Sequence, residues 1–283
     1  MQHGIHIDPY ICSYFYGRTA SSASDDLRAC PVATRTALFG EVTQRQLTEI
    51  SAYAPQALAV TGSAAFDPLA AAVEQLDRDT CRADLGLPAE GRVVTIMANR
   101  FWGPQYWRWF VTTLFDALAQ LPQWRTVIKL HPHDAPDGYL QAAARVGLEK
   151  PLIMRDRLWP AIVAADAVVA CYTTTILDAM ALSRPVVFPR IPGMEDSLGF
   201  AESGGVIAVD DVDQLVAALQ RLDEDPAHLA AQVEGAFPVL EEHLHRVDGR
   251  ASERLALLAD ELSGTSRPSA PPVVAPSEVG EHV

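Results

Sequence analysis

Between residues 91 and 262, short apolar runs alternate with amphipathic stretches that are long enough for helices. The apolar runs contain few polar residues, which is typical of strands buried on both faces. Strands of this kind that alternate with helices indicate a parallel sheet covered by helices on both sides. We therefore predict an α/β protein with a doubly wound parallel sheet over residues 91–263. The predicted strands are 92–98, 125–130, 151–154, 166–171, 184–189 and 205–209. The predicted helices are 104–121, 138–147, 158–165, 174–183, 195–203 and 211–222.

Polar residues follow three of these strands at the points where they end. Asn99 and Arg100 follow the first strand, Lys129 and His131 stand at the end of the second, and residues 172–175 follow the fourth. Doubly wound sheets bind ligands in the crevice at the carboxyl ends of their strands. The sequence therefore predicts a ligand site at this edge.

Three threonines begin the predicted helix at 174–183. Thr173, Thr174 and Thr175 could cap the free amides of the helix, or they could form a cradle for a phosphate, because the helix N-terminus attracts anions. Asp178, about one turn further, could point towards a ribose hydroxyl or merely favour the helix N-terminus. The sequence alone leaves both alternatives open, although the position at the sheet edge favours the cradle.

Histidines supply the candidates for proton transfer. His131 follows Lys129 at a strand end, which favours contact with a phosphate or a role in proton transfer over a purely structural one. His133 is two residues further on, but no third ligand accompanies the pair, so we expect no metal site. His3 precedes a glycine that allows close backbone approach, and its alternative reading is an ordinary terminal residue.

Composition narrows the class of ligand. The chain of 283 residues carries a formal net charge of −14, which argues against a general nucleic-acid binder. Basic residues nevertheless gather in the middle third, and a local basic cluster in an acidic protein suits a small anionic ligand. These residues are Arg100, Arg108, Arg125, Lys129, Arg155 and Arg157.

We expect a soluble, cytoplasmic protein without a metal or an organic cofactor. The first ten residues have no signal-peptide pattern, and no apolar run approaches the roughly 20 residues that span a bilayer. The cysteines are widely spaced and form no CxxC pair, which suits reduced thiols rather than a zinc site. They are Cys12, Cys30, Cys81 and Cys171.

The two ends of the chain lack the regular alternation of predicted strands and helices that is found in the middle. In residues 1–90 we expect a short strand-like run at QHGIHI and a second strand with a turn at 58–67, with polar, Ser-rich and helical pieces between them. We interpret 1–90 as the remnant or closing edge of an N-terminal lobe, 91–263 as the main lobe, and 264–283 as a disordered tail rich in Pro and Ser. The abrupt start favours either a truncated form or a lobe borrowed from a partner.

Several motifs together resemble those of GT-B-type transferases, which use nucleotide-activated donors. The subgroup that the chain resembles is the CDP-glycerol glycerophosphotransferases and related capsular polysaccharide transferases, and the UDP-N-acetylglucosamine 2-epimerases are similar in the last two motifs. The motifs are QHG (2–4), VTGSAAFD (60–67), KLHP (129–132), TTTILDAMALSRPVV (173–187) and DGRASER (248–254).

The resemblance implies two Rossmann-like lobes, of which the N-terminal one is incomplete here, with the donor held by the C-terminal lobe. It implies that His3 acts as the base on the acceptor side and that His131 lies beside the donor phosphates. Thr173–Thr175 match the phosphate-binding helix start, and Asp178 takes a place where an acidic residue, commonly Glu, meets the ribose. Arg100 and Lys129 complete the expected donor-binding set. The segment 248–254 resembles the last helix, which returns to support the lobe.

The resulting hypothesis is a transferase that moves a group from a CDP- or UDP-linked donor to a hydroxyl acceptor in the synthesis of a surface polysaccharide or related glycan. The alternatives are a nucleotide-binding remnant or scaffold subunit without catalysis, and an enzyme similar to the UDP-sugar 2-epimerases. We expect either a homo-oligomer or pairing with a separately encoded N-terminal lobe.

Overall fold

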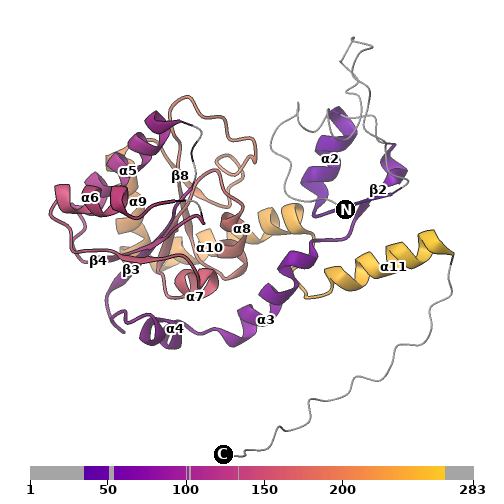
Figure 1. The fold of residues 1–283 in the computed structure, drawn as a ribbon, viewed down its shortest axis with the longest axis horizontal. Helices are drawn as coiled ribbons and strands as arrows, with labels where there is room; N and C mark the ends of the chain where they lie inside the picture. Colours follow the sequence, from indigo (N-terminus) through magenta and orange to yellow (C-terminus); the bar gives the residue numbers. More distant parts are fainter. Residues whose placement is uncertain (1–34, 51–53, 100, 102, 133, 265–283) are drawn as a thin grey trace, which may run out of the picture.

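The computed structural model describes residues 35–50, 54–99, 101, 103–132 and 134–264 (Figure 1). Two residues of the predicted site, His3 and Arg100, lie outside these ranges. The QHGIHI run and residues 265–283 of the predicted tail also lie outside them.

A six-stranded parallel sheet forms the centre of the larger part of the molecule. Its strand order is β5-β4-β3-β6-β7-β8, and every neighbouring pair is parallel. The predicted α/β fold with a doubly wound parallel sheet is therefore confirmed. The strands are β3 (Arg92–Met97), β4 (Trp124–Lys129), β5 (Leu152–Met154), β6 (Ala167–Val169), β7 (Val186–Pro189) and β8 (Ile207–Val209).

Helices cover both faces of this sheet (Figure 1). On one face α5 packs against α6 and α9, and on the other α7 packs against α4 and α8. The central strands β3 and β6 are buried almost throughout, and each fully buried Val, Leu or Ile side chain contributes about 1.5–3 kcal/mol to folding. The helices are α4 (Arg78–Asp84), α5 (Pro104–Leu118), α6 (Asp137–Arg145), α7 (Leu158–Val163), α8 (Thr175–Ala181) and α9 (Val212–Glu224).

The prediction of a helix at 195–203 is wrong. The chain between β7 and β8 runs through turns, with positive φ at Gly193, Gly199 and Gly204. Glycine reaches this left-handed region without strain, and residues in that conformation interrupt a helix. The carboxylate of Asp196 accepts a hydrogen bond from the amide of Ala201 at 2.7 Å, which closes the turn instead.

A smaller part of the molecule lies beside the main sheet. β1 (Thr36–Leu38) and β2 (Leu58–Val60) form a two-stranded parallel sheet, joined through α2 (Glu41–Ile50) and a short 3₁₀ turn (Pro55–Ala57). After β2 the chain makes a second 3₁₀ turn (Ala64–Phe66) and then α3 (Asp67–Gln75), which leads into the main sheet.

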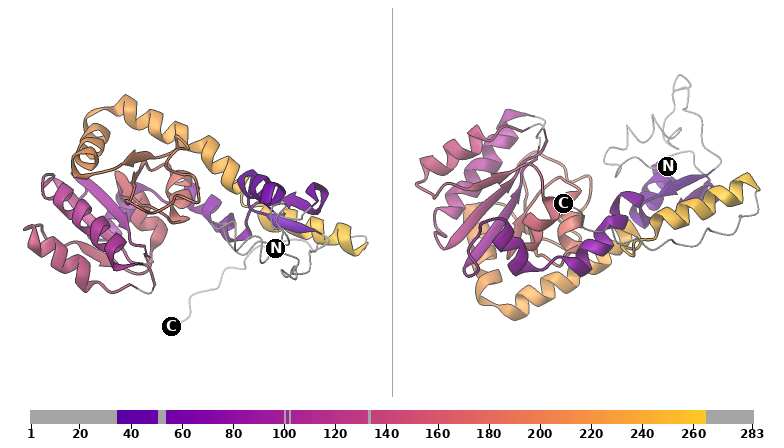
Figure 2. Two further views of the ribbon diagram at one scale, coloured as in Figure 1. Left: turned by 90° about the horizontal axis from the view of Figure 1, so that it is seen from above. Right: turned by 60° about the horizontal axis from the view of Figure 1, so that its bottom comes forward.

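The last two helices connect the two parts. α10 (Pro226–Leu244) packs on α8 and α9 and reaches α2, and α11 (Ala251–Ser263) runs along the smaller part (Figure 2). The carboxylate of Asp67 accepts the amides of Ala251 and Ser252, each at 2.8 Å, and so caps the start of α11. Arg254 donates to the carbonyl of Thr61 at 2.7 Å. The 248–254 segment thus joins α11 to the chain after β2.

Candidate functional site

The carboxyl ends of β3, β4 and β6 lie side by side in the sheet. Met97 pairs with Lys129, and Ile96 pairs with Val169. Because all strands are parallel, the loops that follow them emerge at the same edge. This edge carries the predicted residues Lys129, His131 and Thr173–Thr175, together with Asn99.

Asn99 ties two of these loops together. Its side-chain amide donates to the carbonyls of Cys171 at 3.2 Å and Tyr172 at 2.8 Å. The loop after β3 thereby fixes the backbone immediately before the three threonines. Asn99 is thus a structural link within the predicted site.

Tyr172 holds the same loop from the other side. Its φ is 51°, an unfavourable left-handed conformation for a non-glycine residue, so surrounding contacts must maintain it. Its hydroxyl accepts from the amide of Ile191 at 3.1 Å and donates to the carbonyl of Met194 at 3.4 Å. Its ring packs on Phe188 with a centroid distance of 5.2 Å. The loop is therefore preorganised before any ligand arrives.

The threonines stand at the beginning of α8. The hydroxyls of Thr173 and Thr175 lie 3.2 Å apart, and the amide of Thr175 donates to Thr173 Oγ1 at 3.4 Å. Thr174 occupies the N-cap position without a side-chain cap hydrogen bond, and its side chain is exposed. The amides of Ile176 and Leu177 already donate to the carbonyls of Thr173 and Thr174, at 3.5 and 3.0 Å. The threonine hydroxyls are therefore the donors that this helix start can offer at the carboxyl edge.

Lys129 is the cation at the end of β4. Lys129 lies two residues after Val127, so the two side chains share a face of the sheet. Val127 pairs with Thr95, and the hydroxyl of Thr95 donates a hydrogen bond to the carbonyl of Ala161 in α7. Lys129 therefore lies on the sheet face that α7 covers. Its ammonium donates to the carbonyl of Leu130 at 3.0 Å.

Burial lowers the pKa of Lys129, and Arg155 lowers it further, whereas Asp156 opposes both. Burial disfavours the charged form of this ammonium group. An anionic ligand beside it would stabilise the charged form again.

The loop that carries His131 is braced by a neighbouring arginine. Arg155 donates to the carbonyls of Pro132 at 3.1 Å and Asp134 at 2.7 Å. The amide of Asp134 donates to the carbonyl of His131 at 2.9 Å. The hydroxyl of Tyr139 donates to the carboxylate of Asp134 at 3.2 Å. Arg155 and Tyr139 therefore hold Pro132 and Asp134 close to the partly exposed His131.

Asp178 lies in the first turn of α8 but is only 8% exposed. The indole N–H of Trp159 donates to Asp178 Oδ1 at 2.8 Å. Burial raises the pKa of Asp178 to about 6, although the hydrogen bond from Trp159 opposes the shift. The carboxylate therefore already has a protein partner, and its predicted contact with a ribose stays a prediction.

Trp159 is a residue of this edge that sequence reasoning missed. It stands at the start of α7, directly after the loop that leaves β5, and its ring is only partly buried. Its pairing with Asp178 joins α7 to α8. A tryptophan followed by a proline at a helix start was the available signal, but it did not indicate this partner.

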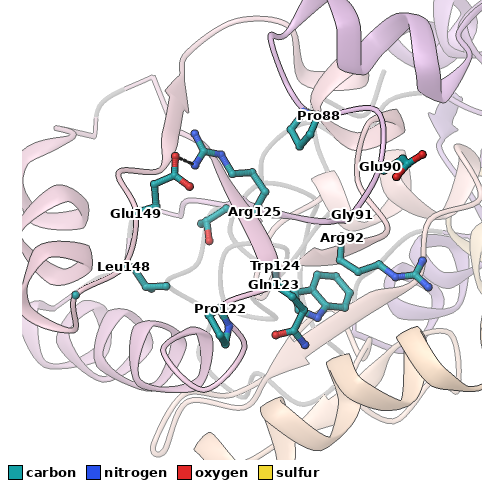
Figure 3. A pocket seen from close by; sticks show the side chains of 12 residues that line it. Pro88, Glu90, Gly91, Arg92, Pro122, Gln123, Trp124, Arg125, Leu148 and Glu149 are labelled. Carbon is teal, nitrogen blue, oxygen red and sulfur yellow. Dashed lines mark ion pairs between the residues drawn. The ribbon is translucent and has the colours of Figure 1, made fainter.

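A cavity of about 420 Å³ opens at the opposite, amino-terminal edge of the sheet (Figure 3). Arg125 turns to one side of it and forms an ion pair with Glu149, whereas Arg92 points to the other side and pairs with Asp223. The two guanidinium groups diverge and are already neutralised, so they do not form a site for an anion within the cavity. Across the part of the chain that the structure describes, no group of His, Cys, Asp and Glu side chains could hold a metal ion.

No protein-family model matches the chain, and no relative was found among curated proteins. Solved structures do match. A UDP-N-acetylglucosamine 2-epimerase from Neisseria meningitidis bound to UDP-GlcNAc has a TM-score of 0.58 and 15% identity, with 82% of this chain and 62% of that one covered. HepE from Anabaena in complex with UDP-glucose has a TM-score of 0.52 and 19% identity, with 80% and 64% covered. Sucrose-phosphate synthase from Thermosynechococcus elongatus has a TM-score of 0.56 and 17% identity, with 92% and 67% covered.

These similarities concern the fold. The predicted resemblance to GT-B-type proteins and to UDP-N-acetylglucosamine 2-epimerases is confirmed at that level. The chain spans roughly 60–67% of the length of the structures that it matches. Along the described part of the chain, no helix is both long and apolar enough to cross a membrane.

Proposed function

We propose that the carboxyl edge of the six-stranded sheet binds the diphosphate of a nucleotide-activated donor, and that the chain takes part in transfer from that donor to a hydroxyl acceptor. The observation that carries this proposal is the convergence of Lys129, His131 and Thr173–Thr175 on one edge, where Asn99 of the loop after β3 fixes the backbone that precedes the threonines. Matching folds that were solved with UDP, UDP-glucose or UDP-GlcNAc support it.

The residues of this edge suit the departure of a phosphorylated group. A hydroxyl of the acceptor attacks the activated carbon of a sugar donor, the bond to the diphosphate breaks, and the nucleoside diphosphate leaves. With a CDP-glycerol donor the attack is at phosphorus, and CMP leaves. In both cases negative charge develops on the leaving phosphate.

Lys129 would neutralise that charge, and the threonine hydroxyls at the start of α8 would donate hydrogen bonds to it. His131 would lie beside the phosphates and exchange a proton there, an effect worth roughly 10²–10⁴-fold in rate. The base on the acceptor side, proposed as His3, lies outside the described residues.

The test uses the only two lysines of the chain, Lys129 and Lys150. Calorimetric titration with UDP, CDP, UMP and CMP should show binding to the wild type. Lys129→Met should weaken diphosphate binding by roughly tenfold or more, since a charge-assisted hydrogen bond contributes about 1.5–3 kcal/mol. Lys150→Met removes an equal charge from an exposed position and should leave binding unchanged. Absence of binding by all four nucleotides at millimolar concentration would refute the proposal.

A binding protein without catalysis would use the same edge, and donor turnover separates the two functions. Release of nucleoside diphosphate or CMP from UDP- and CDP-linked donors, dependent on an added hydroxyl acceptor, supports the transferase. Nucleotide binding without such release supports a scaffold subunit.

A further inference from the structure

Four arginine side chains gather at the amino-terminal edge of the sheet, opposite the proposed donor site. They surround Asp166, which directly precedes β6. Two of them come from α4, one from the start of β3, and one from the loop just before β7. In that order they are Arg78, Arg82, Arg92 and Arg184.

Asp166 already accepts three hydrogen bonds. Its Oδ1 accepts from Arg78 at 2.9 Å, and its Oδ2 accepts from Arg82 and from the amide of Val93, each at 2.7 Å. Arg92 Nη1 lies 3.6 Å from Oδ1. The single negative charge of this carboxylate is therefore shared among three guanidinium groups and cannot neutralise a fourth.

Arg82 and Arg92 have further partners of their own. Arg82 is fully buried and donates to the carbonyls of Ala164, Ala89 and Gly91 at 2.9–3.0 Å. Arg92 forms an ion pair with Asp223. These two guanidinium groups are structural.

Arg184 differs from the other three. Val168 pairs with Val186, so the same register extended back by two residues places Arg184 beside Asp166 on one face of the sheet. Within the described part of the chain, its buried Nε has no hydrogen-bond partner and its guanidinium forms no ion pair. Burial lowers the pKa of Arg184, and the like charges of Arg78 and Arg82 lower it further, although Asp166 opposes them.

The charges around Arg184 do not balance. Four guanidinium groups face two partly buried carboxylates, Asp166 and Asp223. Asp79 lies 3.7 Å from Arg78 but its side chain is 82% exposed, where water screens the pair strongly. A partly buried cation without a partner destabilises the fold, and an anion would remove that penalty.

We propose that Arg184 and Arg78 form a second anion site, for a phosphate-type oxyanion, at the amino-terminal edge of the sheet. The Arg78 side chain is 34% exposed and Arg184 is partly exposed, so solvent reaches both. The planar guanidinium fork matches the oxygens of a phosphoryl group. The ligand is either free phosphate or the phosphoryl group of a small metabolite, and it occupies a place distinct from the donor site.

The test is calorimetric titration of the full chain with inorganic phosphate in a low-salt zwitterionic buffer. Arg184→Met should weaken phosphate binding by about tenfold or more, and Arg78→Gln should weaken it as well. Arg221→Met, at an exposed position of α9, is the matched control and should leave the affinity unchanged. In Lys129→Met, a phosphate-binding event that Arg184→Met weakens should persist, which separates the site from the donor edge.

Thermal unfolding without phosphate shows whether the variants fold. Arg184→Met removes a cation without a partner, so its melting temperature should equal or exceed that of the wild type. A parallel titration with glycerol 2-phosphate identifies the ligand: binding that depends on Arg184 supports a phosphoryl group, and binding of inorganic phosphate alone supports free phosphate. Equal phosphate affinity in the wild type, Arg184→Met and Arg78→Gln would overturn the proposal, as would loss of all phosphate binding in Lys129→Met.

Discussion

At the proposed donor edge, the ionisation of Asp178 makes the stability of the fold depend on pH. Its carboxylate accepts a hydrogen bond from Trp159. The folded-state pKa of Asp178 is raised from 3.8 to about 6, chiefly by burial. The protonated carboxyl group is therefore favoured in the folded state. The stability that this group contributes is fully present below pH 3.8 and is lost as the pH rises through about 6. At neutral pH the ionised carboxylate costs roughly 2–3 kcal/mol relative to the protonated form.

Asp178→Asn should consequently stabilise the fold near pH 7.5. The amide oxygen of asparagine still accepts the indole N–H of Trp159, but it carries no charge. The gain in the free energy of unfolding should shrink as the pH falls from 7.5 to 4.5, and urea denaturation at several pH values measures it. Trp159→Phe serves as a control, because it removes the hydrogen bond that lowers the pKa of Asp178 and leaves the carboxylate in place. A constant difference between wild type and Asp178→Asn over this pH range would show that Asp178 does not titrate as proposed.

Individual side-chain partners were the features least accessible from the sequence. Lys129 and Thr173–Thr175 were placed at one edge because strand ends can be read from buried apolar runs. The Trp159–Asp178 hydrogen bond joins residues 19 positions apart on two different helices, and the Asn99 contacts span 72 and 73 positions. Such pairings depend on how helices and loops pack, and no local pattern predicts them.

Among the elements, continuous apolar runs identified every strand of the main sheet, because strands buried on both faces must be apolar throughout. The helix expected at 195–203 does not form, because this segment contains Gly199 and lies between Gly193 and Gly204, all three with positive φ. The positive φ of Gly199 inside that segment is a consequence of the turn that Asp196 closes. The glycine content was the signal that should have excluded a helix there.

The contact between Asp67 and α11 is the junction between elements that can be tested most simply. Burial alone would raise the pKa of Asp67, but the hydrogen bonds from Ser252 and Ala251 lower it below its ordinary value of 3.8. A lowered pKa means that the carboxylate contributes stability above pH 3.8, and that this contribution is lost as the pH falls through the folded-state pKa.

Asp67→Asn should therefore loosen the start of α11. Asparagine offers one acceptor oxygen where Asp67 offers two, so one of the two amides loses its partner, at a cost of about 1 kcal/mol. Hydrogen exchange of the amides in the first turn of α11 should accelerate at neutral pH, while the amides of β3 and β6 should be unaffected. Asp213→Asn, in the exposed first turn of α9, is the control. Unchanged exchange in α11 would mean that Asp67 does not hold this helix.

For the whole molecule, the main sheet offers two edges, and we assign a different ligand to each. Lys129, His131 and the start of α8 make the carboxyl edge suitable for a nucleoside diphosphate. The cavity at the amino edge in Figure 3 is large, but its arginines are neutralised by carboxylates. The division of the chain at residues 90 and 263 and the expected oligomer stay predictions.

Hydrogen exchange with and without saturating UDP would decide between the two edges, because it locates the nucleotide on the chain. We predict slower exchange in peptides that cover residues 129–134 and 172–178, and unchanged exchange in peptides that cover residues 88–92 and 147–149 of the cavity in Figure 3. Protection confined to 88–92 and 147–149, with none at 129–134 or 172–178, would contradict the assignment of the donor site to the carboxyl edge.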